Sequence, residues 1–195
     1  MSALMIFVGG IFIGHIFTYE IDDVFDGFDR RAYVSELANG AKVNKLIVTD
    51  EEKDLLKTAH LSDEEVIKWV EKAAPDIMTF GHKNYKTRMA ESSNYFTKDG
   101  WKSFSLALQS ARIIESIEAN KQNITSVTDG TPILQSGGVV DGQYQWVAQV
   151  PVKLTYKSGN RVRKDRWIVT LLIQRVPESH NSYGLGVAQW IATMG

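Results

Sequence analysis

Apolar and polar residues alternate along the second half of the chain. Between positions 144 and 156 every even position is apolar, and the odd positions include Gln145, Gln149, Lys153 and Thr155. Successive side chains of a strand point to opposite faces, so this pattern predicts a long strand with one buried face. Apolar residues at the odd positions of 167–173 predict a second strand. Apolar residues at positions 185, 187 and 191 predict a third. An earlier strand lies within 124–140. The turns between them are Asp129-Gly130, Asp141-Gly142 and Ser158-Gly159-Asn160.

The first half of the chain has helical spacing instead. Ser62 and Glu65 form a capping box, and apolar residues recur every three or four positions from 66 to 80. Pro75 is expected to kink or interrupt this helix. A second helix is predicted over about 84–93. Thr97 is expected to cap a third helix, and helical spacing continues to about position 120. The residues predicted to be buried along this helix are Trp101, Phe104, Leu108 and Ala111.

Helices that precede a run of antiparallel strands predict an α+β domain. We expect the helices to pack on one face of a curved antiparallel sheet of about four strands. This domain is predicted to span 62–195, long enough to bury a sizeable core. Residues 20–61 are polar and weakly periodic, which indicates a connecting arm with little core of its own.

The start of the chain, 1–19, carries no formally charged side chain, and residues 3–19 are almost entirely apolar. A bilayer crossing needs about 20 apolar residues, with a range near 17–25, so 3–19 is a short membrane helix or anchor. A signal peptide would have a basic residue before the apolar run and small residues at a cleavage site, and neither occurs. A buried core element is the remaining alternative. Gly10 and Gly14 have the spacing that lets two membrane helices pack closely, although glycine is also simply common in such helices.

Charge and composition exclude several classes of function for this protein. The chain has 195 residues, 22 basic and 23 acidic side chains, a net charge of −1, 44% hydrophobic residues and no cysteine. These values exclude bulk disorder, thiol chemistry and a wholly basic nucleic-acid binder. A basic cluster at 153–166 surrounds a predicted hairpin tip, but Asp165 interrupts it and a solvated hairpin is favoured. Nucleic acid is therefore not an expected partner.

No motif of catalysis or cofactor binding appears in the sequence. The four histidines lack ligand spacing, and there is no nucleophile elbow, phosphate loop or dinucleotide fingerprint. Catalytic residues, metal ligands and cofactors are therefore not expected, nor is a small-molecule substrate. The aromatic side chains inside the predicted elements are candidate core anchors or interaction residues: Trp69, Trp101, Tyr144, Trp146, Trp167 and Trp190.

Several short strings, in a fixed order over about 60–195, together resemble the DotI/IcmL family, which includes the TraM protein of IncI-type conjugative plasmids. These strings are Asn84-Tyr85-Lys86, Phe96-Thr97-Lys98-Asp99-Gly100-Trp101, Asp141-Gly142-Gln143-Tyr144-Gln145-Trp146, Gln149-Val150-Pro151, Thr155-Tyr156, Arg175-Val176-Pro177 and Gly184-Leu185-Gly186-Val187-Ala188-Gln189. The single-span topology before them is also similar to the family.

The resemblance implies a non-enzymatic inner-membrane subunit of a type IVB (Dot/Icm-like) secretion or conjugation system. It implies a single-pass protein whose periplasmic domain has the nuclear-transport-factor-2-like fold of the assembly-factor domain in VirB-type systems. The implied partners are further copies of the chain and other inner-membrane subunits. Family members usually carry a short basic segment before the span, which this sequence lacks, so orientation rests on the resemblance. An enzyme or small-ligand binder of the same cone-shaped fold is the alternative, because one fold can host many functions.

Overall fold

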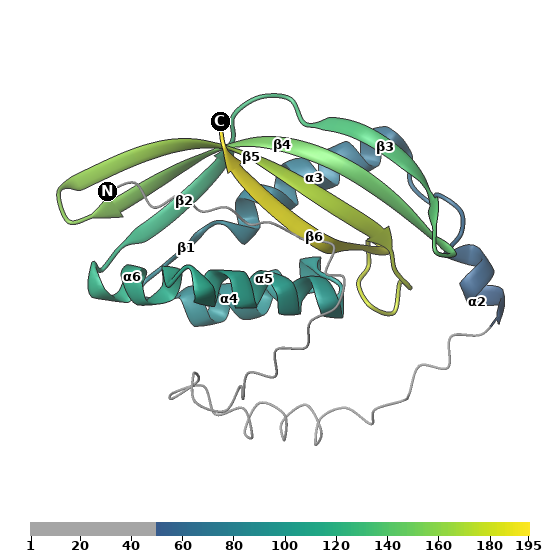
Figure 1. Cartoon of the computed structure of the whole chain (residues 1–195), viewed down its shortest axis with the longest axis horizontal. Helices are drawn as coiled ribbons and strands as arrows, with labels where there is room; N and C mark the ends of the chain where they lie inside the picture. Colours follow the sequence, from purple (N-terminus) through teal and green to yellow (C-terminus); the bar gives the residue numbers. More distant parts are fainter. Residues whose placement is uncertain (1–49) are drawn as a thin grey trace, which may run out of the picture. The chain divides into compact units, whose positions relative to one another are not determined.

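The computed structural model describes residues 50–195, and Figure 1 shows their arrangement. Helices fill the first part of this range and long strands the second, so the predicted α+β class is confirmed. In Figure 1 the helices α4, α5 and α6 lie together on one side of the sheet. The elements are α2 (Asp50–Leu55), α3 (Asp63–Ile77), β1 (Phe80–Gly81), α4 (Tyr85–Ser92), the 3-10 helix η1 (Ser93–Tyr95), α5 (Lys98–Ser110), α6 (Ile113–Ala119), β2 (Asn123–Thr128), β3 (Ile133–Val140), β4 (Gln143–Ser158), β5 (Arg161–Arg175) and β6 (Leu185–Met194).

The sheet is antiparallel and centred on the long strand β4. Its order is β1-β2-β4-β5-β6, and β3 also pairs with β4. Because β5 pairs along almost the whole of one edge of β4, β2 and β3 share the other edge end to end. The described sheet thus has six strands rather than about four. The range 124–140 holds two strands instead of one, because the Asp129-Gly130 turn divides it and β4 is long enough to pair with both.

One contiguous core lies between the sheet and the helices. The even positions of β4 and the odd positions of β5 are buried, as the alternation predicts. Burying a Val, Leu or Ile side chain contributes about 1.5–3 kcal/mol, so these stripes stabilise the fold. The helical side chains that complete the core are Val66, Trp69, Val70, Ala73, Ala74 and Ile77 of α3, Phe104 and Leu108 of α5, and Ile117 of α6.

Two of the predicted turns show why glycine is needed. Asp141 and Gly142, which join β3 to β4, both have positive φ values of 50° and 76°. This pair of left-handed residues is the type I′ hairpin pattern, which matches the twist of the strands it joins. Gly159, between β4 and β5, also has a positive φ, of 55°.

Pro75 is expected to kink or interrupt α3, and of these two effects the interruption does not occur. The helix runs to Ile77, with the proline near its end. Proline lacks an N–H and so leaves the carbonyl four residues earlier, that of Glu71, without its helical partner. The hydroxyl of Thr128, in β2, donates to that carbonyl at 2.9 Å. The carbonyl that the proline leaves open is therefore satisfied by a residue of β2, 57 positions further along the chain.

In α5 and in β6, one residue that the sequence predicts to be buried is not buried. Ala111 is exposed, because Arg112 adopts a left-handed φ of 52° and separates α5 from α6. Ile191 is only half-buried, whereas Trp190 and Ala192 face the core. A bulge opposite Leu172 and Ile173 adds one residue to β6 and switches its buried face from odd to even positions.

The segment 50–61, predicted as the end of the connecting arm, is fastened to the sheet. The N–H of Tyr144 donates to the carbonyl of Leu56 at 2.8 Å. The guanidinium of Arg175 donates to the carbonyl of Thr58 at 2.6 Å and also to that of Leu55. The boundary at 62 stays a prediction. Among the described helices, none is both long and apolar enough to cross a bilayer, and the predicted membrane helix of 1–19, with Gly10 and Gly14, lies outside the described residues.

Candidate protein-contact surfaces

The six aromatic residues singled out in the sequence lie in or against the core. Trp146 is 1% exposed, and the other buried members are Trp69, Trp167 and Trp190. Trp101 and Tyr144 are half-buried and pack against the same core. All six side chains thus contribute to the core, and Trp101 and Tyr144 keep part of their surface exposed. Their role as anchors or interaction residues stays a prediction.

Aromatic rings join α5 to β6. The rings of Phe96 and Phe104 lie 4.8 Å apart, and Phe104 meets Trp190 at 5.5 Å. Trp101 lies 5.5 Å from Phe96 at the rim of this cluster. Such ring pairs contribute about 0.5–1.5 kcal/mol each beyond their burial. The cluster therefore fixes how the helix sits on the sheet.

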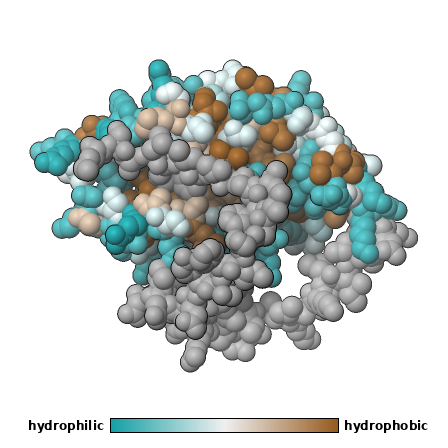
Figure 2. All heavy atoms as spheres, viewed as in Figure 1, coloured by the Kyte–Doolittle hydropathy of each residue, from teal (hydrophilic) through white to brown (hydrophobic). Residues whose placement is uncertain are grey.

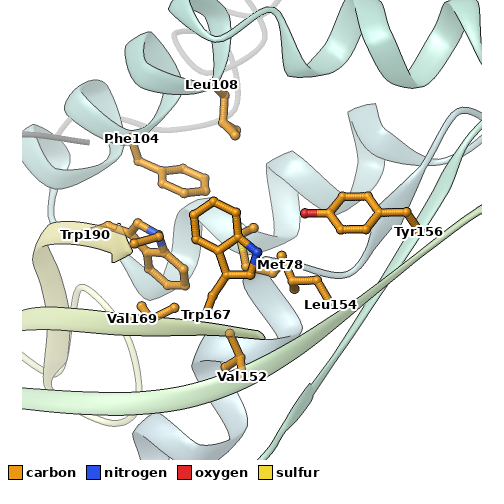
Figure 3. Close-up of a pocket in the computed structure, with 10 residues that line it drawn as sticks. Met78, Phe104, Leu108, Val152, Leu154, Tyr156, Trp167, Val169 and Trp190 are labelled. Atoms are coloured by element: carbon orange, nitrogen blue, oxygen red, sulfur yellow. The ribbon is translucent and has the colours of Figure 1, made fainter. Parts of the chain in front are cut away.

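A small cavity lies between α5 and the sheet, beside Trp167 and Tyr156 (Figure 3). Its volume is about 30 Å³, and its lining is apolar except for the Tyr156 hydroxyl and the indole N–H groups of Trp167 and Trp190. Burial, and secondarily Asp165, raises the pKa of Tyr156. Sites for small molecules usually measure about 300–1,000 Å³ and include convergent polar groups. This cavity is therefore smaller than a typical small-molecule site.

Other polar chemistry in the described part of the chain is dispersed. No group of three or more His, Asp or Glu side chains within 50–195 could hold a metal ion. His60 and His180 each bond a backbone carbonyl, that of Tyr183 at 2.8 Å and that of Phe96 at 2.9 Å. These histidines thus tie loops together.

The basic hairpin between β4 and β5 is partly neutralised from within. Asp129 accepts hydrogen bonds from Lys153 at 3.1 Å and from Arg166 at 2.8 Å, and these contacts lower its pKa. Arg163 pairs with Asp165 at 3.0 Å and lies over the ring of Tyr156. Three of the six cations thus pair with two carboxylates, Asp129 and Asp165, which reduces the attraction of the tip for phosphate.

Exposed apolar side chains concentrate instead on β3. Ile133, Val139 and Val140 are 60%, 53% and 51% exposed. Figure 2 shows hydrophobic residues, in brown, in the upper part of the view, where the sheet lies in Figure 1. The sequence analysis did not single out these residues. The available signal was the absence of any charged side chain between Gly130 and Val140.

Known proteins share this geometry. The profile of a family described as a type-IV b secretion system inner-membrane complex component, DotI/IcmL, matches residues 32–194. The periplasmic domain of DotI has a TM-score of 0.68 and 30% identity, covering 71% of this chain and 99% of that one. A periplasmic fragment of TraM has a TM-score of 0.63 and 22% identity, covering 69% and 98%. No curated protein matches the chain in sequence.

A protein of lower sequence identity has a similar fold. CagV of Helicobacter pylori, a VirB8 homologue of a type IV secretion system, has a TM-score of 0.53 at 10% identity, covering 68% of this chain and 99% of that one. The fold is therefore that of type IV secretion system domains, as expected for VirB-type assembly factors. The chain belongs to the DotI/IcmL family of type IVB inner-membrane complex components.

Proposed function

We propose that this protein is a non-enzymatic inner-membrane assembly component of a type IVB secretion or conjugation system. It acts through self-association and contacts with other inner-membrane subunits in the periplasm. The observation that carries the proposal is the family match over 32–194, together with the 30% identity to the periplasmic domain of DotI over 99% of that domain.

The proposed topology is a single pass through the inner membrane. Residues 3–19 anchor the chain, Gly10 and Gly14 pack the anchors together, and the domain that follows lies in the periplasm. The apolar anchor sequence and the periplasmic origin of the DotI and TraM structures support this arrangement. Confinement to a membrane raises the local concentration of the domains, so individually weak contacts suffice for assembly.

Deletion and detergent extraction together test the proposal. We expect a strain without the protein to lose transfer of the system's substrate, and the full chain to restore it. The full chain extracted in mild detergent should migrate as an oligomer or with other subunits. A strictly monomeric chain in a strain whose transfer survives the deletion would refute the proposal.

A further inference from the structure

Among residues 50–195, strand β3 forms a sheet edge that no other strand covers. Within residues 50–195 it pairs with β4 alone, and six of its eight residues are exposed. A free edge presents unpaired backbone N–H and C=O groups that can template another strand. Proteins commonly block such edges with charged residues or proline, and β3, ILQSGGVV, contains neither. This edge is therefore suited to accept a further strand.

The side-chain pattern of β3 is self-complementary. Read from either end, the strand begins with two apolar residues, and small or polar residues fill its middle. A bulge at Gln135 shifts the alternation between Leu134 and Ser136. Ile133 and Val140 consequently pair with the odd, outward-facing positions Gln149 and Gln143 of β4.

The other two apolar residues share the opposite face. Leu134 and Val139 pair with the even positions Ala148 and Tyr144 of β4. Gly137 lies between the two apolar ends, and its missing side chain leaves room for the ring of Trp146. Each apolar residue at one end thus has a counterpart on the same face at the other end.

We infer that β3 pairs antiparallel with β3 of a second copy of this chain, about a two-fold axis near Gly137. In this register Ile133 lies opposite Val140 of the second copy, and Leu134 lies opposite Val139. Directly opposed residues of an antiparallel pair point to the same face, and the bulge at Gln135 preserves this match. A two-fold contact requires one patch to complement itself, which the pattern of β3 does.

The contact rests on the proposed function and specifies its surface. Eight paired residues bury less than the roughly 1,200–2,000 Å² of a stable interface, so this pair needs the membrane to concentrate it. The pair would join two six-stranded sheets into one continuous sheet across the two copies. Other faces of the domain remain available for different subunits.

The lack of cysteine allows a clean crosslinking test in membranes containing the full chain. We expect the double variant I133C/V140C to form disulfide-linked dimers, because the two positions oppose each other across the axis. Within one strand they are about 23 Å apart, far beyond the roughly 7 Å reach of a disulfide, so neither single variant should crosslink. Coexpression of the two single variants should restore the dimer.

Charge substitutions give a second measurement. Ile133→Lys with Val140→Lys places like charges opposite each other and should reduce the oligomer, whereas Ile133→Lys with Val140→Glu should restore it. Val162→Cys and Val162→Lys are matched controls, because Val162 is 57% exposed at the far end of β4's other neighbour. These controls should neither crosslink nor dissociate the oligomer.

The outcomes separate this inference from the proposed function. If I133C/V140C fails to crosslink while the oligomer persists, the β3 pairing is wrong and the assembly role stands. A crosslink to a different protein also overturns the pairing, since it identifies another occupant of the edge. A full chain that is monomeric in membranes overturns the pairing, and it overturns the assembly role as well only if transfer also survives deletion of the protein.

Discussion

At the residue scale, one carboxylate joins the end of α3 to α4 and η1. Asp76 accepts a hydrogen bond from Arg88 at 2.5 Å through one oxygen and from Tyr95 at 2.9 Å through the other. Arg88 also donates to the carbonyls of Asp76 and Thr79, each at 3.0 Å. Replacing the carboxylate therefore removes the charge that orients the arginine.

We predict that Asp76→Ala lowers the free energy of unfolding by about 1–2 kcal/mol, because charged hydrogen bonds are lost at a half-buried site. The control is Glu91→Ala, which removes the more exposed partner of the same arginine. Its expected effect is below about 0.5 kcal/mol. Urea unfolding followed by tryptophan fluorescence measures both, and equal losses would contradict the assignment.

Two tyrosines predict how stability falls at alkaline pH. Burial, followed by hydrogen bonds to carboxylates, raises the pKa of Tyr85 and Tyr95 from 10.0 to about 12. A tyrosine whose pKa is raised by folding binds its proton more tightly in the folded state. Its stabilising contribution is complete below pH 10 and is lost as the pH rises toward about 12.

We therefore expect the double variant Tyr85→Phe with Tyr95→Phe to lose less stability than the parent chain as the pH rises from 10 toward about 12. Phenylalanine has no proton to release, so this part of the pH dependence disappears. Thermal unfolding across the pH series measures the difference. Identical slopes for parent and variant would show that these hydroxyls do not govern the alkaline transition.

At the element scale, α5 is placed on β6 through a close backbone approach. Thr97 caps the helix by accepting from the N–H of Gly100 at 3.1 Å, and its own N–H donates to the carbonyl of Val187 at 3.0 Å. A Cβ added to Gly100 would lie 2.1 Å from that same carbonyl oxygen. Only glycine therefore lets the first turn of α5 lie against the strand.

Gly100→Ala should destabilise the protein by about 2 kcal/mol or more, because the strand backbone would have to move away from the helix. This outcome opposes helix propensity, which favours alanine over glycine. Gly138→Ala is the control, since a Cβ there meets nothing within 4 Å. If Gly100→Ala is neutral in urea unfolding, α5 and β6 do not approach each other as described.

The sequence predicted helices and strands correctly where the residues that mark them lie close together in the chain. The capping box at Ser62 and the cap at Thr97 begin α3 and α5 as expected, because cap and helix lie within a few residues of each other. The possible interruption at Pro75 does not occur, because a contact distant in the sequence decides. The Glu71 carbonyl that Pro75 leaves open has its partner in Thr128, which no reading of α3 alone can reveal.

At the scale of the whole molecule, the proposed anchor and the folded domain have separate tasks. In the proposed topology the anchor would hold the chain in the membrane, and the domain carries the described surfaces. We predict that removal of 1–19 moves the protein into the soluble fraction and reduces dimer formation by I133C/V140C. The physical reason is the loss of local concentration.

An unrelated single-span helix in place of 1–19 supplies the control for that deletion. It should restore membrane association and crosslinking if the anchor acts only by confinement. If crosslinking remains low, packing of the anchors through Gly10 and Gly14 is also required. Crosslinking that is unaffected by the deletion itself would contradict the role assigned to the anchor.

Local sequence patterns are enough to predict the α+β class, the starts of the main helices, the buried faces of β4 and β5, and the resemblance to the family. These features depend on periodicity, caps and short strings that neighbouring residues define. The strands that share an edge of β4, the bulge that turns β6 and the open edge of β3 within residues 50–195 become visible only in the folded chain. Strand partners and bulges depend on contacts between residues far apart in the chain, so local patterns leave them open.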